Sequence, residues 1–235
     1  MPTKWAARGL VPWDIDQTLL SFGGLVYETY RTVFRRVHGA EPQVMPDVHG
    51  RTDHAITLEL LKLHRLPHED ADVTAFLDVL VQVFRTDLPR TGAAALLLPG
   101  AKEALHTLGE WPIVQSVVTG NVRAVAELKV RQFGLDAWLD LTVGGYGDRT
   151  GRRADLVAAA IGVAQQRYGR TVARRTVVIG DTPYDIEAAV AHGVTAVGVT
   201  SGAYAAAQLS EAGADLTLAS LHDLAPVLAL LAGSA

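Results

Sequence analysis

The strongest constraint on the fold is a regular alternation of helical and extended segments in the second half of the chain. The helical periodicity covers residues 101–108, 122–133, 155–168 and 184–192. Short apolar runs typical of strands lie between and after them, at 113–118, 141–143, 176–180 and 195–200, with an edge strand at 216–218 before a last helix. This alternation predicts an α/β fold, a parallel sheet with helices on both faces and a site at the carboxyl ends of the strands.

The first part of the chain has a different pattern. An apolar run at residues 9–13 predicts the first strand, and the next eighty or so residues show helical periodicity with little strand character. Gly50, Pro67 and Pro89 divide this block. We therefore expect a core formed by residues 1–20 and 96–235, with an all-helical cap domain at residues 21–95 over the mouth of the sheet.

Composition excludes several classes of protein. Hydrophobic residues are 49% and charged residues 20%, which is typical of a globular chain. The net charge of −4 gives no electrostatic case for binding nucleic acid or an anionic membrane. The chain has no cysteine, which excludes disulfides, thiol nucleophiles and zinc–thiolate sites. Residues 1–10 lack a signal-peptide pattern and no apolar run is long enough to span a bilayer, so we expect a cytoplasmic protein. We expect it to be a monomer or a homodimer.

Three polar clusters stand at the ends of predicted strands. They are Asp14-x-Asp16-x-Thr18, Thr119-Gly120-Asn121 and Gly180-Asp181-Thr182-Pro183-Tyr184-Asp185. One such cluster is weak evidence, because acids after an apolar run often only begin a turn or cap a helix. Three clusters after three separate strands meet at one edge of a parallel sheet, so together they predict a single site.

These clusters resemble the motifs of the haloacid dehalogenase superfamily, and the resemblance covers essentially the whole chain. The helical insertion resembles the cap of phosphoglycolate phosphatases, and its segment Gly50-Arg51-Thr52-Asp53 is similar to one often found there. The resemblance implies a Rossmann-like core and a Mg²⁺-dependent phosphatase that acts on a small-molecule phosphate ester. It suggests a phosphoglycolate-like substrate.

The resemblance also implies roles for the aspartates. Asp14 would be the nucleophile that forms an aspartyl-phosphate. Asp14 and Asp181 would bind Mg²⁺ together with the main-chain carbonyl of Asp16, and Asp185 would bind directly or through water. Asp16 would protonate the leaving alcohol and later deprotonate the attacking water. The dehalogenase branch generally lacks this second acid, since a halide leaves without a proton, so a phosphatase is favoured over a dehalogenase.

The phosphate itself would be bound at the second cluster. Thr119 would donate its hydroxyl, and Gly120 and Asn121 would present backbone N–H groups at the start of a helix, where the helix dipole favours an anion. The alternative is an ordinary helix cap, and Asn121 is suited to both roles.

Two further sites offer positive charge. Arg153 stands where relatives place a Lys or Arg that holds the nucleophile and the phosphate, and Arg152 is the alternative. Without a functional role, the two arginines would simply be solvated. Arg51 in the cap would reach a carboxylate or a second phosphate of the substrate, or would be only a surface charge.

Other features leave alternatives open. Gln17 occupies a position that is often Gly in relatives, and a positive φ there would strain it. If this change has abolished turnover, the chain is a catalytically impaired binding protein.

A phosphomutase, a dehalogenase or a phosphonatase would use the same core, although Lys62 is the only cap lysine available for a phosphonatase Schiff base. The glycine-rich segment 144–147 is expected to be a loop and not a nucleotide site.

Overall fold

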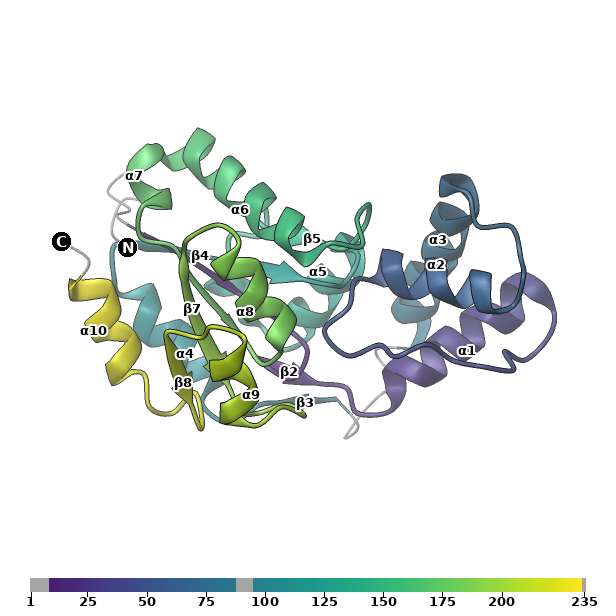
Figure 1. The fold of residues 1–235 in the computed structure, drawn as a ribbon, viewed down its shortest axis with the longest axis horizontal. Helices are drawn as coiled ribbons and strands as arrows, with labels where there is room; N and C mark the ends of the chain where they lie inside the picture. The colour runs from purple at the N-terminus through teal and green to yellow at the C-terminus, as the bar shows by residue number, and fades with distance from the viewer. Residues whose placement is uncertain (1–8, 88–94, 234–235) are drawn as a thin grey trace.

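The computed structural model describes residues 9–87 and 95–233. Its main sheet has six strands, all parallel, in the order β5-β4-β1-β6-β7-β8 (Figure 1). In that order the strands are Gly145–Tyr146, Ile113–Thr119, Gly9–Trp13, Val177–Gly180, Thr195–Val199 and Leu216–Leu218. The predicted parallel sheet is therefore confirmed.

Helices cover both faces of this sheet because its strands are apolar on both sides. Val177 and Ile179 of β6 pack into one apolar cluster, whereas Val178 between them packs into another on the opposite face. The first cluster includes residues of α4 (Ala101–Gly109), α5 (Arg123–Gln132) and α10 (Ala225–Gly233). The second includes residues of α6 (Arg153–Tyr168), α8 (Pro183–Val190) and α9 (Ala206–Glu211). The short helices η4 (Leu135–Ala137) and α7 (Arg170–Ala173) complete the core.

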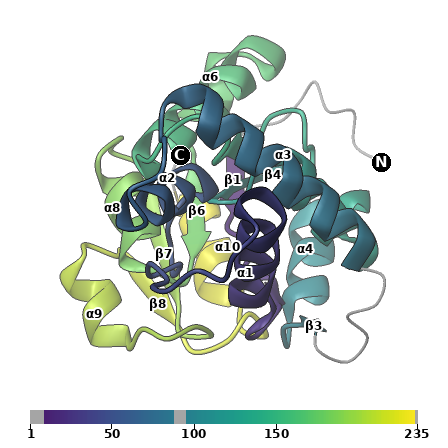
Figure 2. The same cartoon turned by 90° about the vertical axis from the view of Figure 1, so that its right-hand side faces the viewer.

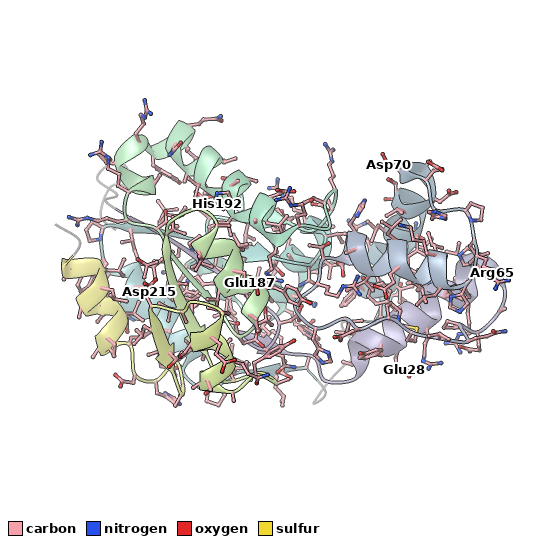
Figure 3. The ribbon with its side chains drawn as sticks, in the orientation of Figure 1. Glu28, Arg65, Asp70, Glu187, His192 and Asp215 are labelled. Carbon is pink, nitrogen blue, oxygen red and sulfur yellow. The ribbon has the colours of Figure 1, made fainter. Side chains whose placement is uncertain are left out.

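Three helices between the first two strands of the sheet form a separate group at one end of the molecule (Figures 1 and 2). They are α1 (Leu25–His38), α2 (Asp53–Leu63) and α3 (Asp70–Asp87). We call them the inserted helices. The chain enters and leaves this group through an antiparallel pair of two-residue strands, β2 (Leu20–Ser21) and β3 (Leu96–Leu97). The labelled Arg65 lies at the end of the group that is remote from the core, and Asp70 lies at its upper edge, where α3 begins (Figure 3).

Two local expectations were wrong. Residues 141–143 form a turn and not a strand, because Asp140 accepts hydrogen bonds from the backbone amide and the hydroxyl of Thr142 and so fixes an Asx-type turn. The strand instead follows at Gly145–Tyr146, inside the glycine-rich segment that was expected to be a loop, and pairs with the end of β4.

Pro12 is an unusual residue in a central strand because it has no N–H to donate. Leu10 and Asp14 donate to the carbonyls of Arg175 and Ile179 on the β6 side, and the residue midway between them is Pro12. The sheet therefore loses one β1–β6 hydrogen bond and keeps those on either side.

The expected break at Pro89 and residues 1–8 lie outside the described residues. Within the described part of the chain, no helix has the length and apolar character needed to span a membrane.

Candidate active site

The carboxyl ends of the three central strands meet at one cavity of about 310 Å³. Asp14 directly follows β1, Thr119 ends β4 and Asp181 directly follows β6. The other predicted residues that line the cavity are Asp16, Arg51, Gly120, Asn121 and Arg153. Asp185, the remaining one, lies behind Arg153 and is 1% exposed. The structure thus brings together every residue that the sequence analysis selected.

Arg153 is the cation of this site. Its Nη2 donates a hydrogen bond to Oδ1 of Asp14 and lies 2.6 Å from Oδ1 of Asp185. Burial opposes its positive charge, but Asp185 and Asp14 outweigh burial and raise the pKa of Arg153 above its ordinary value. Arg152 points elsewhere, since its side chain is 80% exposed. Of the two arginines considered, Arg153 is the one placed to bridge a carboxylate and a phosphate.

The three aspartates around Arg153 carry more negative charge than one guanidinium neutralises. Burial raises the pKa of Asp14 well above its ordinary value even though Arg153 opposes the shift. Burial, with the charge of Asp185, raises the pKa of Asp181 to about 7. Removing carboxylates from water is costly unless cations compensate for the lost hydration. The cluster is therefore short of positive charge.

A divalent cation fits this cluster. One carboxylate oxygen from each of Asp14, Asp181 and Asp185 lies within 4.8 Å of the others. Asp185 uses Oδ2 to accept hydrogen bonds from the amide and hydroxyl of Thr182 in the capping box of α8. Its Oδ1 accepts no hydrogen bond, although Arg153 is near, because the approach lacks hydrogen-bond geometry. Buried carboxylate oxygens with excess charge are ligands that suit Mg²⁺.

Asp16 belongs to a second network, which the sequence analysis missed in part. Lys129 on α5 donates to Oδ1 and Oδ2 of Asp16 at 2.8 and 2.7 Å and to Oδ1 of Asn121 at 2.8 Å. Its side chain is 1% exposed, and the rings of Phe22 and Phe84 lie 4.8 and 5.2 Å from Nζ. The signal that could have revealed Lys129 is its spacing, because Val125, Lys129 and Phe133 share one face of the predicted helix.

The side chain of Asn121 does not cap the helix. It donates to Asp16 at 2.6 Å and to the hydroxyl of Thr119 at 2.8 Å. The N-cap of α5 is Val122, whose amide donates to Oδ2 of Asp53 at 2.7 Å. The second cluster is therefore fixed both by Asp16 in the core and by a carboxylate from the inserted helices.

The N-terminus of α2 packs directly against this loop. The amide of Asp53 donates to the carbonyl of Gly120 at 2.7 Å, and the amide of His54 donates to the carbonyl of Gly147 at 3.2 Å. A Cβ at Gly120 would overlap the carbonyl of Arg51, and a Cβ at Gly147 would overlap the carbonyl of Gly120. Gly120 therefore permits the close approach of the insertion, and Gly147 permits the close approach of its own loop to Gly120.

Tyr30 completes the contact between α1, α2 and the core. Its hydroxyl donates to Oδ1 of Asp53 at 2.8 Å. Burial raises the pKa of Asp53 to about 6, although the amide of Val122 and the charge of Lys129 oppose the shift. Asp53 thus uses both oxygens to connect two helices of the insertion with the amide that begins α5.

Gln17 has a φ of 63°, so the strain expected for a non-glycine residue at this position is present. Its carbonyl accepts a hydrogen bond from Ser201 at 2.5 Å, and its amide donates to the carbonyl of Leu20 at 2.6 Å. Its side-chain amide donates to Ser21 at 3.2 Å. These contacts hold the loop that carries Asp16 in the strained conformation.

Comparisons with known proteins agree with this geometry. The family model described as haloacid dehalogenase-like hydrolase matches residues 11–189. A relative from Dickeya dadantii, probable phosphatase IndB, is 32% identical over 217 residues, which cover 87% of this chain and 86% of the relative.

Solved structures share the fold at lower identity. A protein assigned as a beta-phosphoglucomutase from Bacteroides vulgatus is 17% identical with a TM-score of 0.67, covering 97% of this chain and 90% of that one. A protein assigned as a phosphoglycolate phosphatase from Haemophilus somnus is 17% identical with a TM-score of 0.63, covering 97% and 100%. The matched residues include all three polar clusters, and the chain belongs to the haloacid dehalogenase-like hydrolase family.

Proposed function

We propose that the chain is a Mg²⁺-dependent phosphatase that hydrolyses a small-molecule phosphomonoester through an aspartyl-phosphate on Asp14. The observation that carries the proposal is the pairing of buried Asp14 with Arg153 inside a cavity that also contains Thr119 and Asp16. The name of the Dickeya relative, a probable phosphatase, supports the same chemistry.

In the first step a carboxylate oxygen of Asp14 attacks phosphorus while the bond from phosphorus to the leaving oxygen breaks. Arg153 reduces the repulsion between the carboxylate and the phosphoryl oxygens. The hydroxyl of Thr119 and the backbone amides of Gly120 and Asn121 donate to those oxygens. Mg²⁺, held by Asp14, Asp181, Asp185 and the carbonyl of Asp16, would supply further charge neutralisation.

Asp16 transfers protons in both steps. It protonates the leaving alcohol and then accepts a proton from the water that attacks the aspartyl-phosphate. Its side chain is 33% exposed, whereas those of Asp14 and Asp185 are 6% and 1% exposed. Of these three carboxyl groups, Asp16 is the one that is placed to exchange protons with water.

The inserted helices act in this proposal as a cap of residues 21–95 on a core of residues 1–20 and 96–235. The antiparallel pairing of β2 with β3 supports those bounds, since it joins the chain just before and just after the insertion. The cap contributes part of the cavity wall and holds the phosphate-binding loop through Asp53.

The test measures inorganic phosphate released from 4-nitrophenyl phosphate with Mg²⁺ and with EDTA. We expect activity only with the metal, and we expect Asp14→Asn to be inactive. Asp70→Asn is the matched control, because Asp70 is an exposed residue at the start of α3 that does not line the cavity, so its variant should keep the activity. Activity that survives in Asp14→Asn would overturn the assignment of the nucleophile. Recovery of phosphate on an acceptor alcohol instead of free phosphate would identify a phosphomutase.

A further inference from the structure

The described basic side chains that line the cavity are all engaged by acids of the protein. Arg153 is bound by Asp14 and Asp185, whose negative charge the proposed Mg²⁺ would offset, whereas no such cation is proposed beside the acids of the insertion. His49 and Arg51 line the part of the wall that belongs to the insertion. A leaving group with a carboxylate or a second phosphate would need His49 or Arg51 for recognition. The acids that already contact these two side chains therefore decide whether such a leaving group can bind.

Arg51 is held by two groups of the insertion. Its Nη1 lies 2.5 Å from Oε2 of Glu59 on α2 and donates to the carbonyl of Asp47 at 3.1 Å. The Arg51 side chain is 23% exposed, so the pair is partly removed from water and less screened than a fully exposed one. An anion that approaches Arg51 therefore also meets the negative charge of Glu59.

His49 faces a second acid. Its ring Nδ1 lies 2.7 Å from Oδ1 of Asp47, and its backbone amide donates to the same oxygen at 3.0 Å. That amide hydrogen bond lowers the pKa of Asp47 below its ordinary value, so Asp47 is ionised at neutral pH. The loop that contains His49 thus offers a negative charge next to its histidine. Arg65, another cation of the insertion, lies at the remote end (Figure 3).

Apart from Asp53, whose carboxylate is bound by Tyr30 and Val122, the remaining wall of the insertion side is largely apolar. Val26 and Tyr27 of α1 and Ile56 of α2 line the cavity, together with Phe22. Apolar and aromatic walls with few polar groups are typical of sites that bury the apolar part of a small molecule. The volume of about 310 Å³ is at the small end for such sites.

We propose that this enzyme selects phosphate esters whose leaving alcohol is small, uncharged and largely apolar, and that Glu59 enforces this choice by neutralising Arg51. The proposal rests on the proposed phosphatase function. It replaces the phosphoglycolate-like substrate that the sequence resemblance suggested, since phosphoglycolate carries a carboxylate on its leaving group. Glu59 is then a specificity-determining residue that does not touch the reacting atoms.

The test compares benzyl phosphate with 4-(phosphonooxymethyl)benzoate, which is the same ester with a para-carboxylate. The two leaving alcohols are close in basicity but differ in size by the carboxylate, so the change in the ratio of their kcat/KM values between the wild type and a variant reports the effect of charge. We expect the wild type to prefer benzyl phosphate. Glu59→Gln frees Arg51, so we expect this variant to raise the ratio of carboxylated to neutral ester by about fivefold, the effect of a partly exposed ion pair.

Glu127→Gln is the matched control. Glu127 also pairs with arginines, Arg123 and Arg131, but it does not line the cavity, so the ratio should stay at the wild-type value. A wild-type preference for the carboxylated ester, or a ratio that Glu59→Gln leaves unchanged, would overturn the proposal.

Binding measurements separate this proposal from the phosphatase function. Asp14→Asn should bind both esters without turnover, and calorimetry should show tighter binding of benzyl phosphate. If the wild type hydrolyses neither these two esters nor 4-nitrophenyl phosphate, the phosphatase function fails, and the two affinities still decide the preference of the cavity.

Discussion

At the scale of single residues, Lys129 is the charged group whose removal should have the largest indirect effect. It is buried, and it donates to both oxygens of Asp16 and to Asn121. Lys129→Met keeps a long apolar side chain but removes the charged donor, so that Asp16 keeps only the hydrogen bond from the Asn121 amide. We expect a loss of about 2–4 kcal/mol in the free energy of unfolding, measured by urea denaturation. We also expect kcat to fall more than KM rises, because Asp16 loses its fixed position.

Lys62→Met is the control for this prediction. Lys62 is an exposed lysine of α2, so its replacement should change the stability by no more than about 0.5 kcal/mol. If Lys129→Met retains the wild-type kcat, Lys129 is only a structural residue and does not position Asp16.

Most candidate site residues could be selected from the sequence because they follow strands in three short clusters, whereas Arg51 and Arg153 were selected through the family resemblance. Their partners could not, since a contact such as Lys129 with Asp16 joins positions that are 113 residues apart. A lysine on the apolar face of a helix gives a signal, but it does not identify its acceptor. The positive φ of Gln17 was foreseen only as a condition, because the backbone conformation depends on contacts with Ser201 and Leu20.

At the scale of elements, the contact between α2 and the two core loops is the feature most sensitive to a small change. Gly147→Ala would place a methyl group against the carbonyl of Gly120 and the side chain of Thr52. The loop of Thr119, Gly120 and Asn121 would then have to move away from Gly147, and Thr52 of the insertion would have to shift with it. We expect kcat/KM to fall by about tenfold or more, since small displacements of positioning groups are costly in catalysis.

Gly162→Ala is the matched substitution for Gly147→Ala. A Cβ at Gly162, within α6, meets nothing within 4 Å. This variant should keep its activity and gain about 0.5–1 kcal/mol of stability, because alanine favours the helix. Normal kinetics in Gly147→Ala would show that the close approach does not matter for turnover.

The longer helices and strands could be predicted from periodicity, whereas the short helices η4, α7 and α9 and the shortest strands were not. Two-residue strands such as β2 and β3 have no pattern of their own and exist because the chain pairs on either side of the insertion. The strand expected at 141–143 was displaced to Gly145–Tyr146 because the side chain of Asp140 fixes a turn, a competition that hydrophobicity alone does not show.

At the scale of the whole molecule, the excess of buried carboxylates should make the stability of the metal-free protein depend on pH. The pKa of Asp181 is raised from 3.8 to about 7 and that of Asp53 to about 6. The folded state therefore binds these protons more tightly than the unfolded chain. This contribution to stability is complete below about pH 4 and is lost as the pH rises through 6 and 7.

We expect the Tm of the EDTA-treated protein to fall as the pH rises from about 5 to about 7.5, as followed by differential scanning fluorimetry. Mg²⁺ should reduce this fall, because a cation compensates for the ionised cluster. Asp181→Asn should show a weaker pH dependence without metal. Equal slopes with and without Mg²⁺ would argue against a cation site at Asp14, Asp181 and Asp185.

The paired strands β2 and β3 have a consequence for how such a molecule can change over evolutionary time. Because the chain leaves the core at Ser21 and returns beside it at Leu96, the two cut points of the insertion are neighbours. Everything between them can be exchanged for a different segment without altering the order of the six-stranded sheet. The sheet and the insertion can thus change separately, except that any new insertion must again supply a carboxylate like that of Asp53, which accepts from the amide that begins α5.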